Sequence, residues 1–486
     1  MLHIAKGLEP LWDDYLVDTR YTDARLSVNK PQRIGSVMTF DKPWEGKATC
    51  YFHIIKDDDI YRMYYLGWNV GCRNLPHEGF YVCYAESKDG LEWVRPSLGI
   101  QEYQGSTDNN ILIDPKKLTD GFFVMKDENP NCPPNMKYKA VTQRLHENGM
   151  PYLMGYVSAD GIHFEEYGMI SDGYHYDSLN VLIWSQAKGK YYLFFRCRHE
   201  KPEDANSPFK ETKVRDLIVA ESEDFVNWSE PKPFDFQGAE DYPLYTNAIS
   251  EYLYDKRYFV GFPTRYNERR EWNASFERLC GKENRKYLME YSAKHDFEKT
   301  PRYGLAITDG LFMFSRDGYT WHRFDEACYP PGPERDMSWI YGNGYPAVGL
   351  IETPGRYEDE EPEITQFVKE ACWDRKTPEL LRYVWRKDGF ASYKADYKKT
   401  MLLTKPFTFE GETLSMNFCT SARGGIYIKV LDEYSNPIEG YSTCEMFGDS
   451  VNRIIDFDKP FGELQGKKIR LQFEMRDAEL FALGFS

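Results

Sequence analysis

The stretch FSRDGYTW (314–321) combines the end of an apolar run, a tight turn and a returning aromatic side chain. Similar stretches occur three more times: YAESKDGLEW (84–93), YVSADGIHF (156–164) and VAESEDFVNW (219–228). The Ser and Asp side chains can bond backbone groups of a turn, and Gly tolerates a positive φ there. The aromatic side chain is then expected to pack back onto its own strand. Asp89, Asp160, Asp224 and Asp317 are therefore interpreted as turn residues rather than catalytic groups.

Each interval between these turns is long enough for a blade of four short strands. Radial repetition of such sheets is typical of a β-propeller. The sequence therefore predicts an all-β protein: a five-bladed β-propeller catalytic domain over 1–386, followed by a C-terminal β-sandwich domain over 387–486, where the repeat is absent. The alternative is a set of unrelated hairpin turns. The expected blades are 30–95, 96–168, 169–232, 233–323 and 324–386, the last closed by an N-terminal strand, with a partly helical insertion at 267–300.

Composition limits the classes of partner. The chain has 486 residues and a formal net charge of −16, which opposes binding to a phosphate backbone. Its 37 Tyr, 30 Phe and 11 Trp favour β-structure and include rings suited to stacking on sugars. No apolar run reaches the length of a membrane span, and the N-terminus has no signal-peptide pattern. We expect a cytoplasmic protein with free thiols, although a chain that has lost its signal stays open.

Several stretches carry a family resemblance: PWEG (43–46), KDENP (126–130), YDSLN (176–180), YYLFFR (191–196), EDYPLYT (240–246) and ITDGLFMFSRDGYTWHRF (307–324). Together they resemble a bacterial group similar to the five-bladed propellers of glycoside hydrolase family 32, with a C-terminal sandwich. The related families 43, 62 and 68 act on fructans and arabinans. The resemblance implies carboxylates in a central funnel and a furanoside substrate. The nucleophile motif of family 32 is absent, and KDENP matches the Arg-Asp-Pro motif only loosely.

Acids that begin or precede the innermost strands are the candidates for catalysis, because glycoside cleavage needs two carboxyl groups near the scissile bond. Asp177 is the first choice, since it opens an otherwise apolar strand, where polar groups cost free energy unless they are used. The candidate catalytic residues are Asp177, Glu45, Asp127, Glu240, Asp241 and Asp309. The candidate substrate-binding residues are Trp44, His175, Arg196, Arg265 and Trp339.

These observations predict a glycoside hydrolase that cleaves oligosaccharides, of the fructose- or arabinose-type furanoside class. The alternatives are a glycoside phosphorylase or transglycosylase, and a sugar-binding propeller without catalysis. We expect no catalytic metal and no cofactor, while a structural Ca²⁺ ion stays open. The expected partner is an oligosaccharide or glycoside, not nucleic acid or membrane, and self-association into a homo-oligomer stays open.

Overall fold

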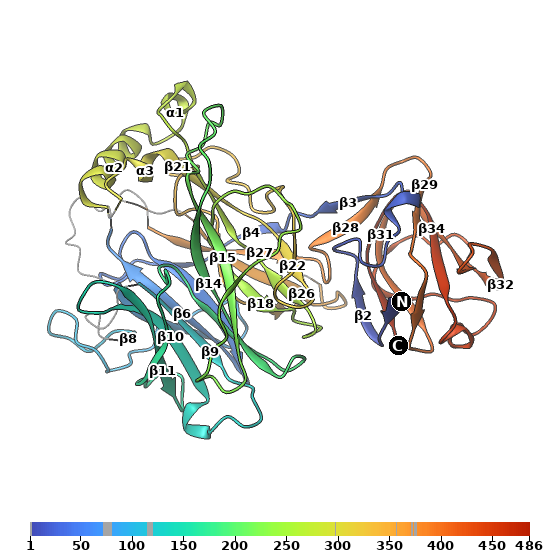
Figure 1. Cartoon of the computed structure of the whole chain (residues 1–486), viewed down its shortest axis with the longest axis horizontal. Helices are drawn as coiled ribbons and strands as arrows, with labels where there is room; N and C mark the ends of the chain where they lie inside the picture. The colour runs from blue at the N-terminus through green and yellow to red at the C-terminus, as the bar shows by residue number, and fades with distance from the viewer. Residues whose placement is uncertain are drawn as a thin grey trace. The chain divides into compact units, whose positions relative to one another are not determined.

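The computed structural model describes residues 2–70, 80–113, 120–296, 298–355, 357–370, 373 and 377–486. The chain is mostly β-structure and divides into two compact units (Figure 1). The terminal unit contains Met1–Pro31, Pro354–Glu363 and Trp385–Ser486, and the central unit contains Gln32–Thr353 and Ile364–Val384. The change of unit at Trp385 lies beside the expected boundary at 386. The N-terminal residues, however, belong with the C-terminal strands and not with the expected propeller range.

The terminal unit is built on a ten-stranded sheet within the described residues. Its two long strands, β31 (Leu414–Asp432) and β34 (Ile469–Phe485), pair antiparallel along most of their length. N-terminal strands complete it: β1 (Leu2–Ile4) beside β30 (Phe407–Phe409), β2 (Gly7–Pro10) beside β34, and β3 (Arg25–Val28) beside β28 (Ala391–Ala395). The remaining strands are β29 (Thr400–Leu403), β32 (Pro437–Ser442) and β33 (Asp449–Ile454). The N-terminal residues join this unit because its strands would otherwise carry unpaired backbone groups.

The central unit contains six sheets within the described residues, and five of them, each of four or five strands, follow one another along the chain. The first holds β5 (Cys50–Asp57), β6 (Ile60–Trp68), β7 (Phe80–Ser87) and β8 (Ile111–Ile113). The second holds β9 (Asp120–Lys126), β10 (Tyr138–Leu145), β11 (Pro151–Ser158) and β12 (Glu165–Asp172). The third holds β13 (Val181–Ser185), β14 (Lys190–Glu200), β15 (Lys213–Ser222) and β16 (Lys232–Pro233). The fourth holds β18 (Ile249–Glu251), β19 (Phe259–Gly261), β22 (Met313–Ser315) and β23 (Trp321–Arg323).

The fifth sheet is assembled from both ends of the central unit. It holds β24 (Tyr345–Pro346), β25 (Ile351–Thr353), β26 (Glu363–Glu370) and β27 (Glu379–Trp385), and β4 (Gln32–Thr39) forms its outer edge. β4 pairs antiparallel with β27, as the expected closure by an N-terminal strand requires. The fifth sheet also touches the first, since His53 and Val348 form a parallel bridge. The first and fifth sheets are therefore neighbours, although they come from opposite ends of the central unit's sequence.

The repeated turns have one hydrogen-bond pattern at all four sites. In the first, Ser87 Oγ accepts the N–H groups of Asp89 and Gly90, and Asp89 Oδ1 accepts those of Leu91 and Glu92. The turns that begin at Ser158, Ser222 and Ser315 repeat these bonds. The Ser and Asp of the repeat therefore satisfy turn N–H groups, as the sequence predicts.

Trp321 and Trp93 pack onto a neighbouring sheet, which corrects the expectation that they pack on their own, whereas Trp228 packs on Phe225 of its own turn. Trp321, fully buried, stacks on Phe234 at 5.1 Å and contacts Phe194 of β14 in the preceding sheet. Trp93 contacts Phe367 of the fifth sheet at 5.8 Å between ring centroids. The rings of Trp321 and Trp93 therefore fill the space between their own sheet and a neighbouring one. The repeat thus joins sheets as well as ending strands.

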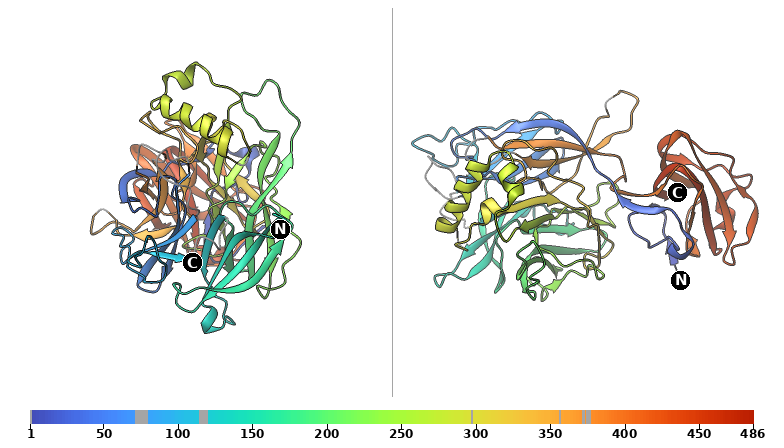
Figure 2. Two further views of the ribbon diagram at one scale, coloured as in Figure 1. Left: turned by 90° about the vertical axis from the view of Figure 1, so that its left-hand side faces the viewer. Right: turned by 90° about the horizontal axis from the view of Figure 1, so that it is seen from above.

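The expected helical insertion is present in the central unit. Helices α1 (Ala274–Arg278), α2 (Lys282–His295) and α3 (Arg302–Leu305) lie together at one edge of this unit (Figures 1 and 2). A small sheet of β17 (Leu244–Thr246), β20 (Thr264–Glu268) and β21 (Ala306–Gly310) connects them to the fourth sheet. Short 3₁₀ helices occur at Thr19–Tyr21, Pro134–Met136 and Phe461–Leu464. No helix among the described residues has the length and apolar character needed to cross a membrane.

Candidate active site

Two carboxyl groups meet where the innermost strands of the second and third sheets begin. Asp120 is the first residue of β9, and Asp177 lies just before β13. The backbone N–H of Ser178 donates a hydrogen bond of 3.1 Å to Asp120 Oδ2, so Asp120 is next to the residue that follows Asp177. Gly121 allows this approach, because a Cβ there would lie 2.3 Å from the carbonyl oxygen of Ser178. Gly121 also has a φ of +44°, in the region that favours glycine.

Arginine side chains from the third sheet surround Asp177. Arg196 of β14 forms an ion pair with Asp177. Arg198, two residues further on the same strand, lies directly opposite Arg215 of β15. Glu298 stands between these like charges: its Oε1 accepts hydrogen bonds from Arg198 at 3.1 Å and from Arg215 at 3.0 Å. The site therefore contains three guanidinium groups close to two ionised carboxylates.

The environment shifts the pKa values of the two aspartates in opposite directions. Burial, followed by the nearby charge of Asp177, raises the pKa of Asp120 to about 7, against the opposing effects of Ser178 N–H and Arg196. Burial also disfavours ionisation of Asp177. There, however, the charge and hydrogen bonding of Arg196, helped by Arg198 and Arg215, outweigh burial and hold the pKa below its usual value. Near neutral pH one carboxyl can donate a proton while the other is a carboxylate.

Tyrosines from other sheets complete the surroundings. Tyr51 of β5 has a left-handed backbone with φ of +57°, and its phenol is near enough to Asp120 and Tyr245 to be affected by their charge. Tyr245 of β17 lies under the guanidinium of Arg196, 4.8 Å from ring centroid to Cζ. Tyr341 donates a hydrogen bond of 2.7 Å to the Tyr245 hydroxyl. Burial raises the pKa of Tyr51 and Tyr341, so these phenols stay neutral.

The structure brings together two of the residues selected from the sequence, Asp177 and Arg196. Glu45 is elsewhere: it is fully buried in an ion pair with Arg95 at 2.7 Å and accepts a hydrogen bond from Tyr65 at 2.6 Å. Asp127 is also enclosed, because it pairs with Lys139 and accepts a hydrogen bond from Tyr191 at 2.7 Å. Asp127 follows the last residue of β9. At about 3.3 Å per residue, it is roughly 20 Å from Asp120 at the other end.

The other acids selected from the sequence are Asp309 and Asp241, whose carboxylates are paired, and Glu240, whose backbone carbonyl accepts a hydrogen bond. Asp309 forms a bidentate ion pair with Arg265, with distances of 3.0 Å to Nε and 2.7 Å to Nη2. Asp241 is exposed and 3.1 Å from His199 Nε2, while Glu240 is exposed and its carbonyl oxygen accepts a hydrogen bond from Arg323. Arg265 and Asp309 therefore satisfy one another.

The remaining substrate-binding candidates have varied surroundings. Trp44 donates a hydrogen bond of 2.7 Å to Asn110 and packs on Tyr103, which holds its ring in the core of the first sheet. His175 is exposed, two residues before Asp177. Trp339 packs on a small apolar cluster beside the helices and lines a separate cavity of 320 Å³.

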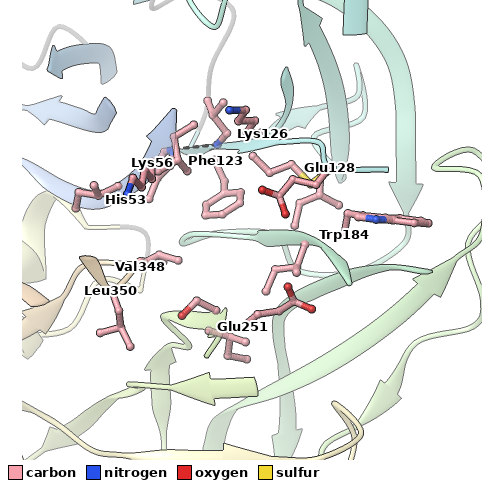
Figure 3. A pocket seen from close by; sticks show the side chains of 18 of the residues that line it. His53, Lys56, Phe123, Lys126, Glu128, Trp184, Glu251, Val348 and Leu350 are labelled. Carbon is pink, nitrogen blue, oxygen red and sulfur yellow. Dashed lines mark hydrogen bonds between the residues drawn. The ribbon is translucent and has the colours of Figure 1, made fainter. Parts of the chain in front are cut away.

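Another cavity lies further along the same innermost strands. It has a volume of 220 Å³ and is lined by His53–Lys56 of β5, Phe123–Lys126 of β9, Leu182–Trp184 of β13, Ile249–Glu251 of β18 and Val348–Leu350, the segment between β24 and β25. Strands of four sheets and a connecting segment of the fifth therefore line one cavity. The carboxyl groups of Glu128 and Glu251 face this space (Figure 3). Burial raises the pKa of Glu251 to about 7.

Asp120 is the residue of this carboxyl pair that the sequence reasoning did not select. It has the signal that selected Asp177, an acid directly before an apolar strand, here in TDGFFVM (119–125). The likeness of KDENP to a family motif favoured the opposite end of this strand. Arg215 and Glu298 have no comparable signal, because the register of β15 and the fold of the insertion bring them to the site. Among the described residues, no group of three or more His, Cys, Asp or Glu side chains could hold a metal ion.

No protein-family model matches the chain, and no curated protein sequence matches it significantly. Solved structures with some similarity include a thermostable family-43 glycoside hydrolase (TM-score 0.39, 11% identity, 73% of this chain and 95% of that chain). Another is the GH93 α-L-arabinofuranosidase of Fusarium graminearum with arabinobiose (TM-score 0.36, 11% identity, 77% of this chain and 93% of that chain). A third is an N-acetylgalactosamine deacetylase from F. plautii with blood group B trisaccharide (TM-score 0.41, 12% identity, 78% and 94%). Similarity at this level does not establish a shared fold or activity.

Proposed function

We propose that the chain is a glycoside hydrolase with Asp120 and Asp177 as its catalytic pair. The observation that carries this proposal is that the Ser178 N–H holds the Asp120 carboxyl group beside Asp177, whose carboxylate pairs with Arg196. The surroundings also shift the two pKa values in opposite directions, to about 7 for Asp120 and below the usual value for Asp177. Two adjacent carboxyl groups in different protonation states are what glycoside cleavage requires. A protein that only binds sugars has no use for a protonated acid beside an ionised one.

The two aspartates then have different roles. Asp120 donates its proton to the glycosidic oxygen as the bond to the anomeric carbon breaks. Asp177 supplies the negative charge on the other side, either by attacking the anomeric carbon or by taking a proton from an attacking water molecule. Arg196 holds the Asp177 carboxylate ionised and oriented. Tyr51 and Tyr341 are buried and their phenols stay neutral, so they add no charge beside the carboxyl pair.

The proposed fold is a five-bladed β-propeller with a separate β-sandwich. Its support is the succession of five sheets of four or five strands, the bridge between His53 and Val348, and the cavity lined by strands of the first four of these sheets and by Val348–Leu350 of the fifth. In this arrangement the innermost strands of the second and third blades begin at the same end of the central channel. That geometry explains why Asp120 and Asp177 meet although they are far apart in the sequence.

The substrate class we propose is a furanoside of the fructose or arabinose type, which rests on the sequence resemblance. The test is a panel of aryl furanosides and pyranosides incubated with the purified protein, with the anomeric form of the product followed by NMR. Hydrolysis of a furanoside supports both the activity and the class. Hydrolysis of pyranosides alone would keep the activity and reject the class, and no hydrolysis of any member would reject the proposed function.

A further inference from the structure

The arginines at the candidate active site exceed the carboxylates that face them. Arg196, Arg198 and Arg215 stand against Asp177 and Glu298. The pKa of Asp120 lies at about 7, so this residue adds little negative charge below neutral pH. The nearby Arg302 pairs with Asp296 at 2.7 Å and also lies 3.8 Å from Glu298, and the charges of Arg302 and Asp296 cancel in this balance. One positive charge remains uncompensated beside the catalytic pair.

Some hydrogen-bond donors of these arginines also have no acceptor among the described residues. Among the described residues, Nε and Nη1 of Arg196 and Nε of Arg215 are buried without an acceptor. Buried donors without partners cost free energy, and those on a charged group cost the most. Arg198 and Arg215 face each other directly across two strands, an arrangement of like charges that is itself unfavourable. Burial and the charges of Arg215 and Arg196 lower the pKa of Arg198.

The cluster is open to a ligand at one side. The side chain of Arg198 is 25% exposed and that of Asp177 is 40% exposed, whereas Arg196 and Arg215 are almost completely buried. Tyr245 and Tyr266 hold the buried guanidinium groups in place from beneath, with Arg215 Cζ 4.6 Å from the Tyr266 ring. Arg198 is thus the residue that an entering group meets first, with a fixed positive region behind it.

We propose that Arg196, Arg198 and Arg215 form a binding site for an oxyanion next to the catalytic pair. Guanidinium groups present paired N–H donors that match the oxygens of a carboxylate, sulfate or phosphate. The oxyanion would belong to the substrate, which would be an acidic sugar such as a uronate, or a sugar sulfate or phosphate ester. This assignment of the oxyanion to a substrate rests on the proposed function. Inorganic phosphate has the same chemistry and would instead act as the attacking group in a phosphorylase.

Ligand binding tests the site without depending on turnover. Isothermal titration calorimetry at constant ionic strength would measure glucuronate, galacturonate, inorganic phosphate and sulfate, with glucose as the neutral comparison. The full chain is compared with Arg198→Met and with Arg198→Lys. The lysine keeps the positive charge but lacks the paired N–H donors of the guanidinium group. Arg144→Met is the matched control, because Arg144 also lies on a strand, is 28% exposed and pairs with a single carboxylate, Glu166.

We expect at least one oxyanion to bind, with Kd raised tenfold or more by Arg198→Met, raised less by Arg198→Lys and unchanged by Arg144→Met. Binding of uronates without phosphate identifies an acidic sugar. Binding of phosphate, with sugar 1-phosphate formed when a glycoside is added, identifies the phosphorylase. If no oxyanion binds, or if Arg198→Met and Arg144→Met weaken binding equally, the inference is wrong. Hydrolysis of neutral glycosides with no oxyanion binding would keep the proposed function and reject this site alone.

Discussion

The backbone N–H of Ser178 lies 3.1 Å from Asp120 Oδ2 and donates a hydrogen bond to it. This bond joins the beginnings of two innermost strands from different sheets and places the carboxyl group of Asp120 beside Asp177. Ser178 has a φ of +83° and Gly121 a φ of +44°, so the two segments adopt left-handed backbone conformations where they meet. Such conformations cost free energy for a non-glycine residue and are frequent at functional sites.

The pH dependence of activity should follow the two aspartates. Asp177 must be ionised and Asp120 protonated, so kcat/KM should fall at acidic pH and again as pH rises through about 7. The measurement is kcat/KM against pH from 4 to 9 for the wild type and for Asp120→Asn, whose side chain does not titrate. The variant should lack the fall near pH 7. A fall that persists unchanged in Asp120→Asn would assign it to another group.

Gly121→Ala should disturb the site through the backbone. The new Cβ would lie 2.3 Å from the Ser178 carbonyl oxygen, so the two strand ends must separate and Asp120 must move away from Asp177. We expect kcat to fall by about 10²-fold, because a displacement of about 1 Å has that effect on positioned groups. Gly189→Ala is the control, since Gly189 has a φ of +66° and nothing within 4 Å of the added atom. Equal activity in both variants would show that the close approach is not needed.

Trp321→Ala should destabilise the central unit without affecting sugar binding. The ring is fully buried and stacks on Phe234 at 5.1 Å between two sheets. Its removal should cost about 3–5 kcal/mol of unfolding free energy, measured by chemical denaturation. Trp228→Ala, at the partly exposed position of the equivalent turn, should cost less. Loss of sugar binding with unchanged stability would instead make Trp321 a ligand contact.

Glu251 should make the protein less stable at high pH. Burial raises its pKa in the folded state to about 7, above the value of an unfolded chain, so the folded state binds the extra proton. The stability that this proton supports is complete below the unfolded pKa and is lost as pH rises through about 7, to an extent of up to about 3 kcal/mol. Glu251→Gln should therefore be more stable than wild type at pH 8 and similar at pH 4.

The control for that measurement is Glu92→Gln, at an exposed turn residue. Its stability should follow the wild type at every pH. A constant difference between Glu251→Gln and wild type from pH 4 to pH 8 would mean that Glu251 does not titrate in this range.

The repeated turn predicted much of the architecture because its chemistry is local. Ser87 and Asp89 satisfy N–H groups within the next residues of the chain, so the sequence alone contains the whole motif. The packing of the Trp321 ring could not be predicted in this way, because its partner Phe194 belongs to another sheet. Only the packed structure places the two rings together.

Part of the candidate site was also predictable, because two of its residues stand in recognisable local patterns. Asp177 and Arg196 were selected from patterns within a single strand. Asp309 and Arg265 were also selected, but cross-strand pairing in β20 and β21 brings them together as a bidentate ion pair. An acid at a strand end is therefore a useful signal, and the partner that satisfies it comes from tertiary structure.

The most direct test of the catalytic pair compares a glycoside that has a poor leaving group with a 2,4-dinitrophenyl glycoside of the same sugar. We expect Asp120→Asn to lower kcat/KM by about 10³-fold on the first and far less on the second, because only the poor leaving group needs a proton. Asp177→Asn should lower both, while Asp108→Asn, at an exposed acid, should lower neither. Full activity in Asp120→Asn and Asp177→Asn on both substrates would contradict the account.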